Sequence, residues 1–333
     1  VLGDNSIEHG PLEALFTVDE EAGMTGAFGL EPGYFDGEIL LNTDSEDEGE
    51  VYMGCAGGVD ANIRFTIEQE AVPNGHSPFS IVVEGLKGGH SGVDIHLGRG
   101  NANKVLARTL FELAAVHALR LVSIDGGSLR NALPREASAQ VYIPNQNIEA
   151  FKIDLANLVD TFKHELDAVE PDLAIFLDPG DTSEHVFTLS LQTRLLAALY
   201  GCPHGVFRMS DEIKGVVETS NNLGVIQTRN NEIYVQCLIR SLMDSRRIDA
   251  QNTIGSIFKL AGATVEFTGA YPGWQPDTSS KIMGVVRETY NQLFGEVPKI
   301  MVIHAGLECG LFKDAYPNWD MVSYGPTIRF PHS

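Results

Sequence analysis

Short apolar runs near both ends of the sequence constrain the fold more than any other feature. One pair covers residues 12–18 and 38–44, and a second pair covers residues 300–306 and 321–325. Apolar runs of this length, followed by an acid or a turn, are typical of buried strands in parallel sheets. We therefore expect one α/β sheet built from the two ends of the chain. In such sheets, ligands collect just beyond the carboxyl ends of the strands.

The long middle region mixes alternating strand patterns with amphipathic helix patterns, which predicts a separate α+β domain. Alternating apolar residues predict a hairpin with strands at 223–228 and 232–239, which places Arg240 on one definite face. Apolar stripes predict helices at 102–119 and from about 250 to 260. Two halves rich in strands and helices fit within the region, which favours a doubled module. The expected division is a first domain of residues 1–56 and 265–333, truncated at both ends, and an inserted domain of residues 57–264.

Charge and composition exclude several classes of partner. The chain has 23 basic and 45 acidic side chains, a net charge of −22, which repels nucleic acid and anionic lipid. The longest apolar stretch, residues 105–122, contains charged side chains and predicts no membrane span. The 4 cysteines are widely spaced and form no disulfide framework, so we expect a reduced, cytoplasmic setting.

Three acids and a histidine are candidates for a metal-dependent hydrolytic site. Glu20 and Glu21 follow the first apolar run, Asp44 follows the second, and His332 lies close to the last residue. Mixed Asp, Glu and His ligands from distant parts of a chain suit zinc or manganese with an open position for water. Taken singly, adjacent acids are typical of the first turn of a helix, and Asp44 is typical of a turn.

Three further residues are candidates for binding a substrate. A glycine-rich turn around His90 favours an imidazole placed to stabilise an oxyanion. Asn131 offers an amide donor, and the guanidinium of Arg240 suits a terminal carboxylate. The alternatives are an ordinary polar turn at His90 and an internal salt bridge from Arg240 to Asp244 or another acid.

The sequence resembles the aminoacyl-histidine dipeptidases of the M20 metallopeptidase family along essentially the whole chain. The segments that carry the resemblance are TVDEEAGM (17–24), NTDSE (42–46), LKGGHSG (86–92), LRNALPRE (129–136), GAYPGW (269–274) and HAGLECG (304–310). The resemblance implies a zinc-peptidase-like α/β catalytic domain, with a central mixed sheet and flanking helices, interrupted by an inserted α+β lid domain. It also implies a homodimer.

The resemblance further implies hydrolysis of dipeptides of the Xaa-His type, which are carnosine-like, with broad specificity. In that reading a water is activated between two zinc ions, for which Mn²⁺ or Co²⁺ are possible substitutes. Glu20 is then the general base, and the expected zinc ligands are Glu21, Asp44 and His332. The residues expected to bind the substrate and its oxyanion are His90, Asn131, Arg240 and Gly306.

The chain departs from the family pattern at its beginning. Family members carry, upstream of the position of Val1, a His-x-Asp motif and then an aspartate that bridges the two metals. Asp4 superficially imitates that bridge but lies too close to the run at 12–18. We therefore expect a fragment that is inactive alone. The alternatives are an N-acyl amino acid amidohydrolase of the same fold and a non-catalytic, lid-centred binding module.

Overall fold

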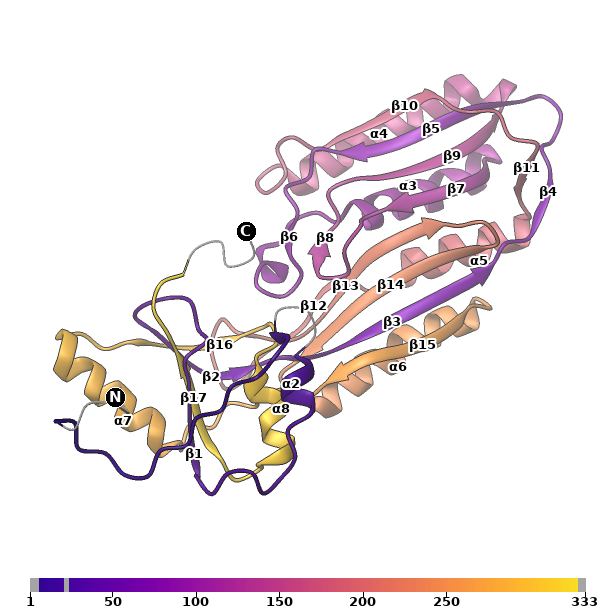
Figure 1. The fold of residues 1–333 in the computed structure, drawn as a ribbon. Helices are drawn as coiled ribbons and strands as arrows, with labels where there is room; N and C mark the ends of the chain where they lie inside the picture. Colours follow the sequence, from indigo (N-terminus) through magenta and orange to yellow (C-terminus); the bar gives the residue numbers. More distant parts are fainter. Residues whose placement is uncertain (1–5, 21–23, 329–333) are drawn as a thin grey trace. The chain divides into compact units, whose positions relative to one another are not determined.

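The computed structural model describes residues 6–20 and 24–328, and Figure 1 draws their helices and strands. Helices and strands are interspersed along the chain, which confirms the expected mixed α/β class. No helix within these two ranges is both long enough and apolar enough to cross a membrane.

The chain divides into two compact units. Unit 1 combines Val1–Gly57 with Tyr271–Ser333, and unit 2 is Gly58–Ala270. The second boundary lies six residues beyond the division expected after residue 264, because strand β15 (Thr264–Tyr271) joins the sheet of unit 2 beside β3 (Gly57–Thr66).

Unit 1 contains a four-stranded mixed sheet in the order β1-β17-β2-β16. β1 runs parallel to β17, β17 antiparallel to β2, and β2 parallel to β16. Helix α7 contacts β17 and helix α8 contacts β2 (Figure 1). The elements of this unit are α2 (Thr25–Phe28), β1 (Ile39–Asn42), β2 (Glu50–Cys55), α7 (Lys281–Phe294), β16 (Lys299–Ile303), α8 (Glu308–Ala315) and β17 (Asp320–Tyr324).

The apolar core of unit 1 joins residues from both ends of the chain. Cys55 at the end of β2 and Trp274 pair through their backbones, with both N···O distances 2.9 Å. Trp319, just before β17, lies in the same core, and its indole N–H donates to the carbonyl of Gly37 at 2.6 Å. The buried residues of this core are Ala27, Cys55, Trp274, Cys309, Leu311, Phe312, Trp319 and Met321.

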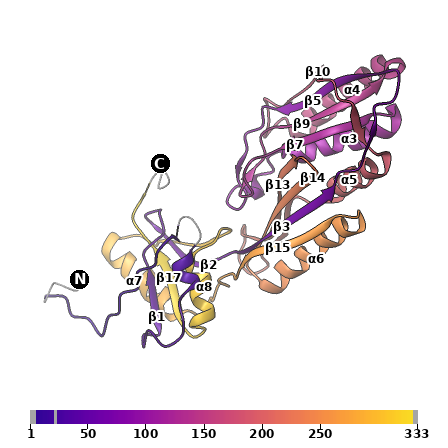
Figure 2. The ribbon, with the colours of Figure 1, turned by 45° about the vertical axis from the view of Figure 1, so that its right-hand side comes forward.

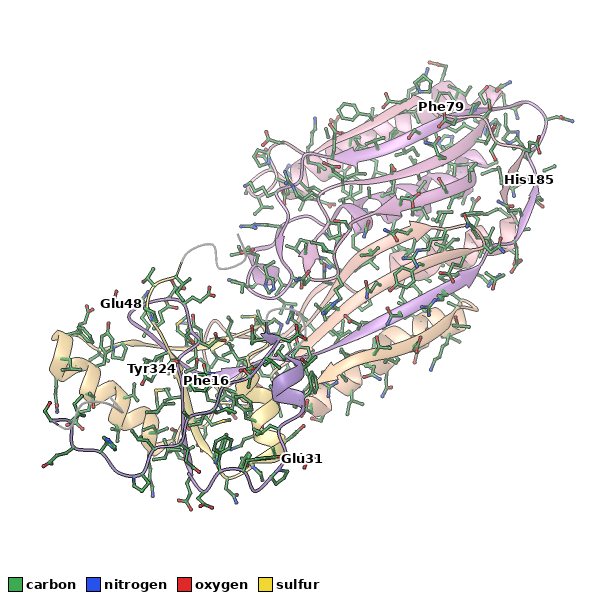
Figure 3. All side chains as sticks on the ribbon, in the orientation of Figure 1. Phe16, Glu31, Glu48, Phe79, His185 and Tyr324 are labelled. Atoms are coloured by element: carbon green, nitrogen blue, oxygen red, sulfur yellow. The ribbon has the colours of Figure 1, made fainter. Side chains whose placement is uncertain are left out.

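The prediction of a strand at residues 12–18 is wrong. The segment is irregular, and Phe16 and Val18 are 91% and 69% exposed. Figure 3 labels Phe16 in this segment. A strand needs a neighbour for its backbone groups, and no strand in the described part of the chain pairs with this segment. The carbonyl of Val18 instead accepts from the N–H of Gly26 at 3.0 Å. The strands expected at 38–44, 300–306 and 321–325 are confirmed as β1, β16 and β17.

Unit 2 is built around a nine-stranded sheet whose main path is β10-β5-β9-β7-β13-β14-β3-β15, with β12 paired to β13. The α-helices of unit 2 pack against one face of this sheet, as the two views in Figures 1 and 2 show. The elements of the sheet and its helices are β3, β5 (His76–Glu84), α3 (Ala102–His117), β7 (Arg120–Gly126), β9 (Ala137–Pro144), α4 (Ile148–Leu166), β10 (Ala174–Pro179), α5 (Leu189–Gly201), β12 (Gly205–Met209), β13 (Val217–Thr228), β14 (Glu232–Ser241), α6 (Asp244–Leu260) and β15.

The topology of unit 2 is that of a doubled module. The first half, β5-α3-β7-β9-α4-β10, places its fourth strand beside its first and its third beside its second. The second half, β3-α5-β13-β14-α6-β15, has the same arrangement, and β7 meets β13 where the halves join. Each half is a βαββαβ unit of the ferredoxin-like kind. The expected hairpin is confirmed as β13 and β14, and the expected helices as α3 and α6.

Short elements complete unit 2. β6 and β8 form a separate two-stranded sheet, and β4 pairs with β11. These elements are β4 (Gln69–Ala71), β6 (Gly89–His90), η1 (Ile95–Leu97), β8 (Ala132–Leu133), η2 (Asn145–Asn147) and β11 (His185–Phe187).

Candidate active site

A cavity of about 270 Å³ in unit 1 brings together three residues that the sequence singled out. Glu20, Asp44 and Gly306 all line it, although they come from segments far apart in the chain. The complete lining is Glu20, Asp44, Ser45, Glu46, Asp47, Tyr52, Ile303, Gly306 and Leu307. The cavity is therefore rich in carboxylates, which repel one another and favour a nearby cation.

Hydrogen bonds to β17 fix the turn that carries Asp44. The side-chain oxygen of Asn42 accepts from the backbone N–H of Asp44 at 3.1 Å and from the hydroxyl of Ser323 at 2.7 Å. The hydroxyls of Ser45 and Ser323 lie 2.6 Å apart. A Cβ on Gly325 would lie only 1.8 Å from the carbonyl oxygen of Ser45, so the close approach requires glycine.

The described residues on either side of Glu20 include two with an unusual backbone conformation. Asp19 and Met24 have positive φ angles of 59° and 52°, which non-glycine residues rarely adopt. The carboxylate of Asp19 accepts from the hydroxyl of Thr25 at 3.0 Å. Backbone of this kind often occurs at functional sites, where the surrounding structure must hold it.

Glu308 is a buried acid that the sequence analysis did not assign. Glu308 is the first residue of helix α8 and is 6% exposed. Its carboxylate accepts from the hydroxyl of Thr17 at 2.9 Å. Its second oxygen has no hydrogen-bond partner within the described ranges. Burial raises the pKa of Glu308, and the charge of Asp44 raises it further. Its place in the HAGLECG segment was the available signal, but an acid in the first turn of a helix is usually exposed.

In unit 2, the two short strands β6 and β8 bring the glycine-rich turn and the Asn131 loop together. His90 pairs with Ala132, and the N–H of Ser91 donates to the carbonyl of Asn131 at 2.8 Å. The ring nitrogen Nδ1 of His90 accepts from the N–H groups of Gly92 and Val93, at 3.2 and 3.0 Å. Because a backbone N–H can only donate, Nδ1 carries no proton, and a neutral His90 has its proton on Nε2.

Arg240 supplies a buried positive charge close to this pair of loops. It lies in β14, is 5% exposed, and lowers the pKa values of both His90 and Asp60. The pKa of His90 falls from 6.5 to about 4, first through burial and then through Arg240. Burial raises the pKa of Asp60 more than Arg130 and Arg240 lower it, and Asp60 forms an ion pair with Arg130 at 3.1 Å.

Asp244, one of the acids considered as a partner for Arg240, forms an ion pair with Arg247. The carboxylate of Asp244 lies 3.1 Å from the guanidinium of Arg247, one turn along helix α6. Arg240 itself follows Ile239 in β14 and pairs with Ser220 of β13.

Two of the expected metal ligands, Glu21 and His332, lie outside the residues that the structure describes. Within 6–20 and 24–328, no group of three or more His, Cys, Asp or Glu side chains is arranged to hold a metal ion. Asp44 is the expected ligand whose position is described, and it lines the carboxylate-rich cavity.

Comparisons with known proteins identify the family. Residues 82–170 match the M20 peptidase dimerisation domain. Over all 333 residues the chain is 49% identical to the cytosol non-specific dipeptidase of Escherichia coli (strain K12), of which it covers 69%. The crystal structure of aminoacylhistidine dipeptidase from Vibrio alginolyticus is 55% identical, with a TM-score of 0.95 over 100% of this chain and 68% of that one. The chain therefore belongs to the aminoacyl-histidine dipeptidases of the M20 metallopeptidase family.

Proposed function

We propose that this protein hydrolyses dipeptides of the Xaa-His type, with broad specificity, in a reaction that depends on zinc. The observation that supports this most is the cavity in unit 1, which Glu20, Asp44 and Gly306 line together. The names of the two relatives, a non-specific dipeptidase and an aminoacylhistidine dipeptidase, support the same substrate class. The name of the Escherichia coli relative also supports a cytoplasmic setting.

The residues of this chain proposed to hold zinc are Glu21, Asp44 and His332. Carboxylates and an imidazole suit zinc, and they also accept Mn²⁺ or Co²⁺. The cavity beside Asp44 fits a cationic occupant, because Glu20, Glu46 and Asp47 line it as well. Zinc ions bound there would polarise the peptide carbonyl and favour the deprotonation of water.

Glu20 is proposed to transfer the proton in this reaction. As general base it accepts a proton from the attacking water, whose oxygen forms a bond to the carbonyl carbon of the dipeptide. The carbon–nitrogen bond then breaks, and Glu20 returns the proton to the departing amine. The products are two free amino acids, and no oxidant or reductant is needed.

Three residues of unit 2 are proposed to bind the dipeptide. A neutral His90 with its proton on Nε2 is a hydrogen-bond donor suited to a developing oxyanion. Asn131 adds an amide donor, and Arg240 pairs with the terminal carboxylate. In unit 1, Gly306 is proposed to contact the substrate through its backbone, because it lines the cavity and has no side chain.

The test is hydrolysis by the protein before and after zinc is supplied. A carnosine-like Xaa-His dipeptide and an N-acetyl amino acid are compared as substrates, and bound zinc is measured by elemental analysis. We expect turnover of the dipeptide and two zinc ions per chain. Turnover of the N-acetyl amino acid alone would favour the amidohydrolase alternative. No turnover with fewer than two zinc ions would favour a non-catalytic binding module.

A homodimer is proposed as the assembly, because residues 82–170 match a domain described as a dimerisation domain. Within this chain, strand β7 of that domain pairs with β13. The strands at the two ends of the sheet path are β10 and β15. Light scattering after size-exclusion chromatography tests the proposal, and a mass of one chain would refute it.

A further inference from the structure

The buried side chain of Asn222 holds the loop that carries Asn131. Its side chain lies on β13 and is completely buried. Its amide nitrogen Nδ2 donates to the carbonyl of Arg130 at 2.9 Å and to the carbonyl of Ala132 at 2.8 Å. Both N–H bonds of one side chain therefore bind the two carbonyls that flank Asn131.

The carbonyl between them is held from a different direction. The N–H of Ser91, next to His90, donates to the carbonyl of Asn131 at 2.8 Å. Three successive carbonyl groups in the loop are thus fixed, while residue 131 itself is exposed. The backbone of Asn131 is held in place, and its side chain remains accessible.

β13 is shaped to let the loop approach. The pairing between β13 and β14 shifts register between Leu223 and Val225, which places Gly224 at a bulge. A Cβ on Gly224 would lie 3.0 Å from the Cα and carbonyl oxygen of Arg130. From the loop side, Gly127 has a φ of 66°, and a Cβ there would lie 1.9 Å from the carbonyl oxygen of Gly224. Both glycines permit backbone-to-backbone contact.

A buried amide at this position has a cost. The oxygen Oδ1 of Asn222 is buried and has no hydrogen-bond partner among the residues described. An unsatisfied buried polar atom costs about 1–3 kcal/mol, which an apolar side chain in the strand would avoid. In return the chain gains the two bonds from Nδ2, which hold the carbonyls on both sides of the exposed Asn131.

We propose that Asn222 is a positioning residue for Asn131, which it holds in the orientation that binds the substrate. This inference rests on the proposed function, because it assumes that Asn131 contacts the dipeptide. Asn222 does not touch the substrate itself. Its effect on the reaction is transmitted entirely through the backbone of residues 130–132.

The test uses Asn222→Leu and the matched control Asn221→Leu in the complete protein. Asn221 is the neighbouring residue of the same strand, is equally buried, and faces the opposite side of the sheet. Its amide donates to the carbonyl of Pro203 at 2.7 Å, away from the Asn131 loop. Both substitutions remove a buried amide, so a loss that is merely structural should affect both variants.

We expect Asn222→Leu to lower kcat/KM for the dipeptide by about 10- to 100-fold, the size expected when a binding group is misplaced. In an Asn131→Ala background the same substitution should lower it less than about twofold, because the side chain that it positions is gone. Asn221→Leu should have the same small effect in both backgrounds. Equal effects of Asn222→Leu with and without Asn131 would refute the proposal.

Hydrogen exchange gives a readout that does not require activity. Amide exchange in residues 128–133 should be faster in Asn222→Leu than in Asn221→Leu, and unchanged exchange would also refute the proposal. If Asn222→Leu does not fold, Gly224→Ala displaces the loop from the same strand and enters the same comparison. Absence of dipeptide hydrolysis by the unsubstituted protein would refute the proposed function, while the exchange measurement still decides whether Asn222 holds the loop.

Discussion

His90 is expected to remain neutral well below the pH at which an ordinary histidine gains a proton. Burial and the charge of Arg240 lower its pKa from 6.5 to about 4, against the opposing effect of Asp94. The N–H groups of Gly92 and Val93 both donate to Nδ1, so a proton on Nδ1 would break two hydrogen bonds. At pH 7 the ring should therefore be a neutral donor through Nε2.

The size and sign of the effect on stability follow from the two pKa values. The unfolded chain binds the proton near pH 6.5 and the folded chain near 4, so stability is lost as the pH falls between these values. Between pH 7.5 and 5 the loss from this group is about 2 kcal/mol. Because the ring is partly exposed, solvent screening reduces the expected loss to about 1–2 kcal/mol.

The assay is a pH titration of the imidazole nitrogens by NMR in protein labelled with ¹⁵N-histidine. His90→Gln assigns the resonance, and it should also lose about 1–2 kcal/mol less stability than the unsubstituted protein between pH 7.5 and 5 in urea unfolding. Arg240→Gln should raise the pKa of His90, and Asp94→Asn should lower it, because the two charges act in opposite directions. A pKa near 6.5, or a proton on Nδ1, would refute the reasoning.

Three further results are expected. Glu20→Gln should lower kcat for the dipeptide by about 10²- to 10⁴-fold and leave the bound zinc unchanged, and a kcat within a few fold of the original would contradict its role as general base. Dialysis of the complete protein against a chelator should abolish hydrolysis, and zinc should restore it more effectively than magnesium because the proposed ligands include an imidazole. Thr17→Val should lower the free energy of unfolding by about 1–3 kcal/mol, since it removes the hydroxyl that donates to buried Glu308. Thr17→Ser, which keeps that donor, should lower it much less in calorimetry.

Local sequence patterns predicted the helices and strands whose own residues show a clear apolar periodicity. The hairpin of β13 and β14 alternates apolar and polar residues around a turn at 230–231, and α3 shows a clear apolar stripe. Residues 12–18 have an equally apolar pattern but form no strand, because strand formation depends on a neighbouring strand that no local pattern encodes. The direction of β16 was likewise not predictable from its local sequence. β16 runs antiparallel to β1 and β17, and this direction depends on how the chain connects the strands.

The candidate site was predictable in its residue types and only partly in its arrangement. The pattern at Asp44 and Glu20 predicted acids at one site, and both line one cavity. The pairing of β6 with β8 joins His90 to the Asn131 loop, about 40 residues further along the sequence. Strands of only two residues leave no periodic pattern from which this pairing could be predicted. Glu308 and Asn222 were not assigned because their importance comes from burial, and neither position differs locally from an ordinary helix or strand residue.

Binding of the substrate carboxylate should change the acidity of His90 through Arg240. The positive charge of Arg240 is one of the two causes that lower the pKa of His90, and burial is the larger. If a carboxylate pairs with Arg240, it partly cancels that charge, so the pKa of His90 should rise on binding. Added burial by the ligand would act in the opposite direction, so the two mechanisms predict opposite signs. NMR titration of His90 with a non-hydrolysed dipeptide analogue, compared with the same analogue whose carboxylate is amidated, separates them. An upward shift with the free carboxylate alone places the carboxylate at Arg240, and the same shift with both ligands would exclude it.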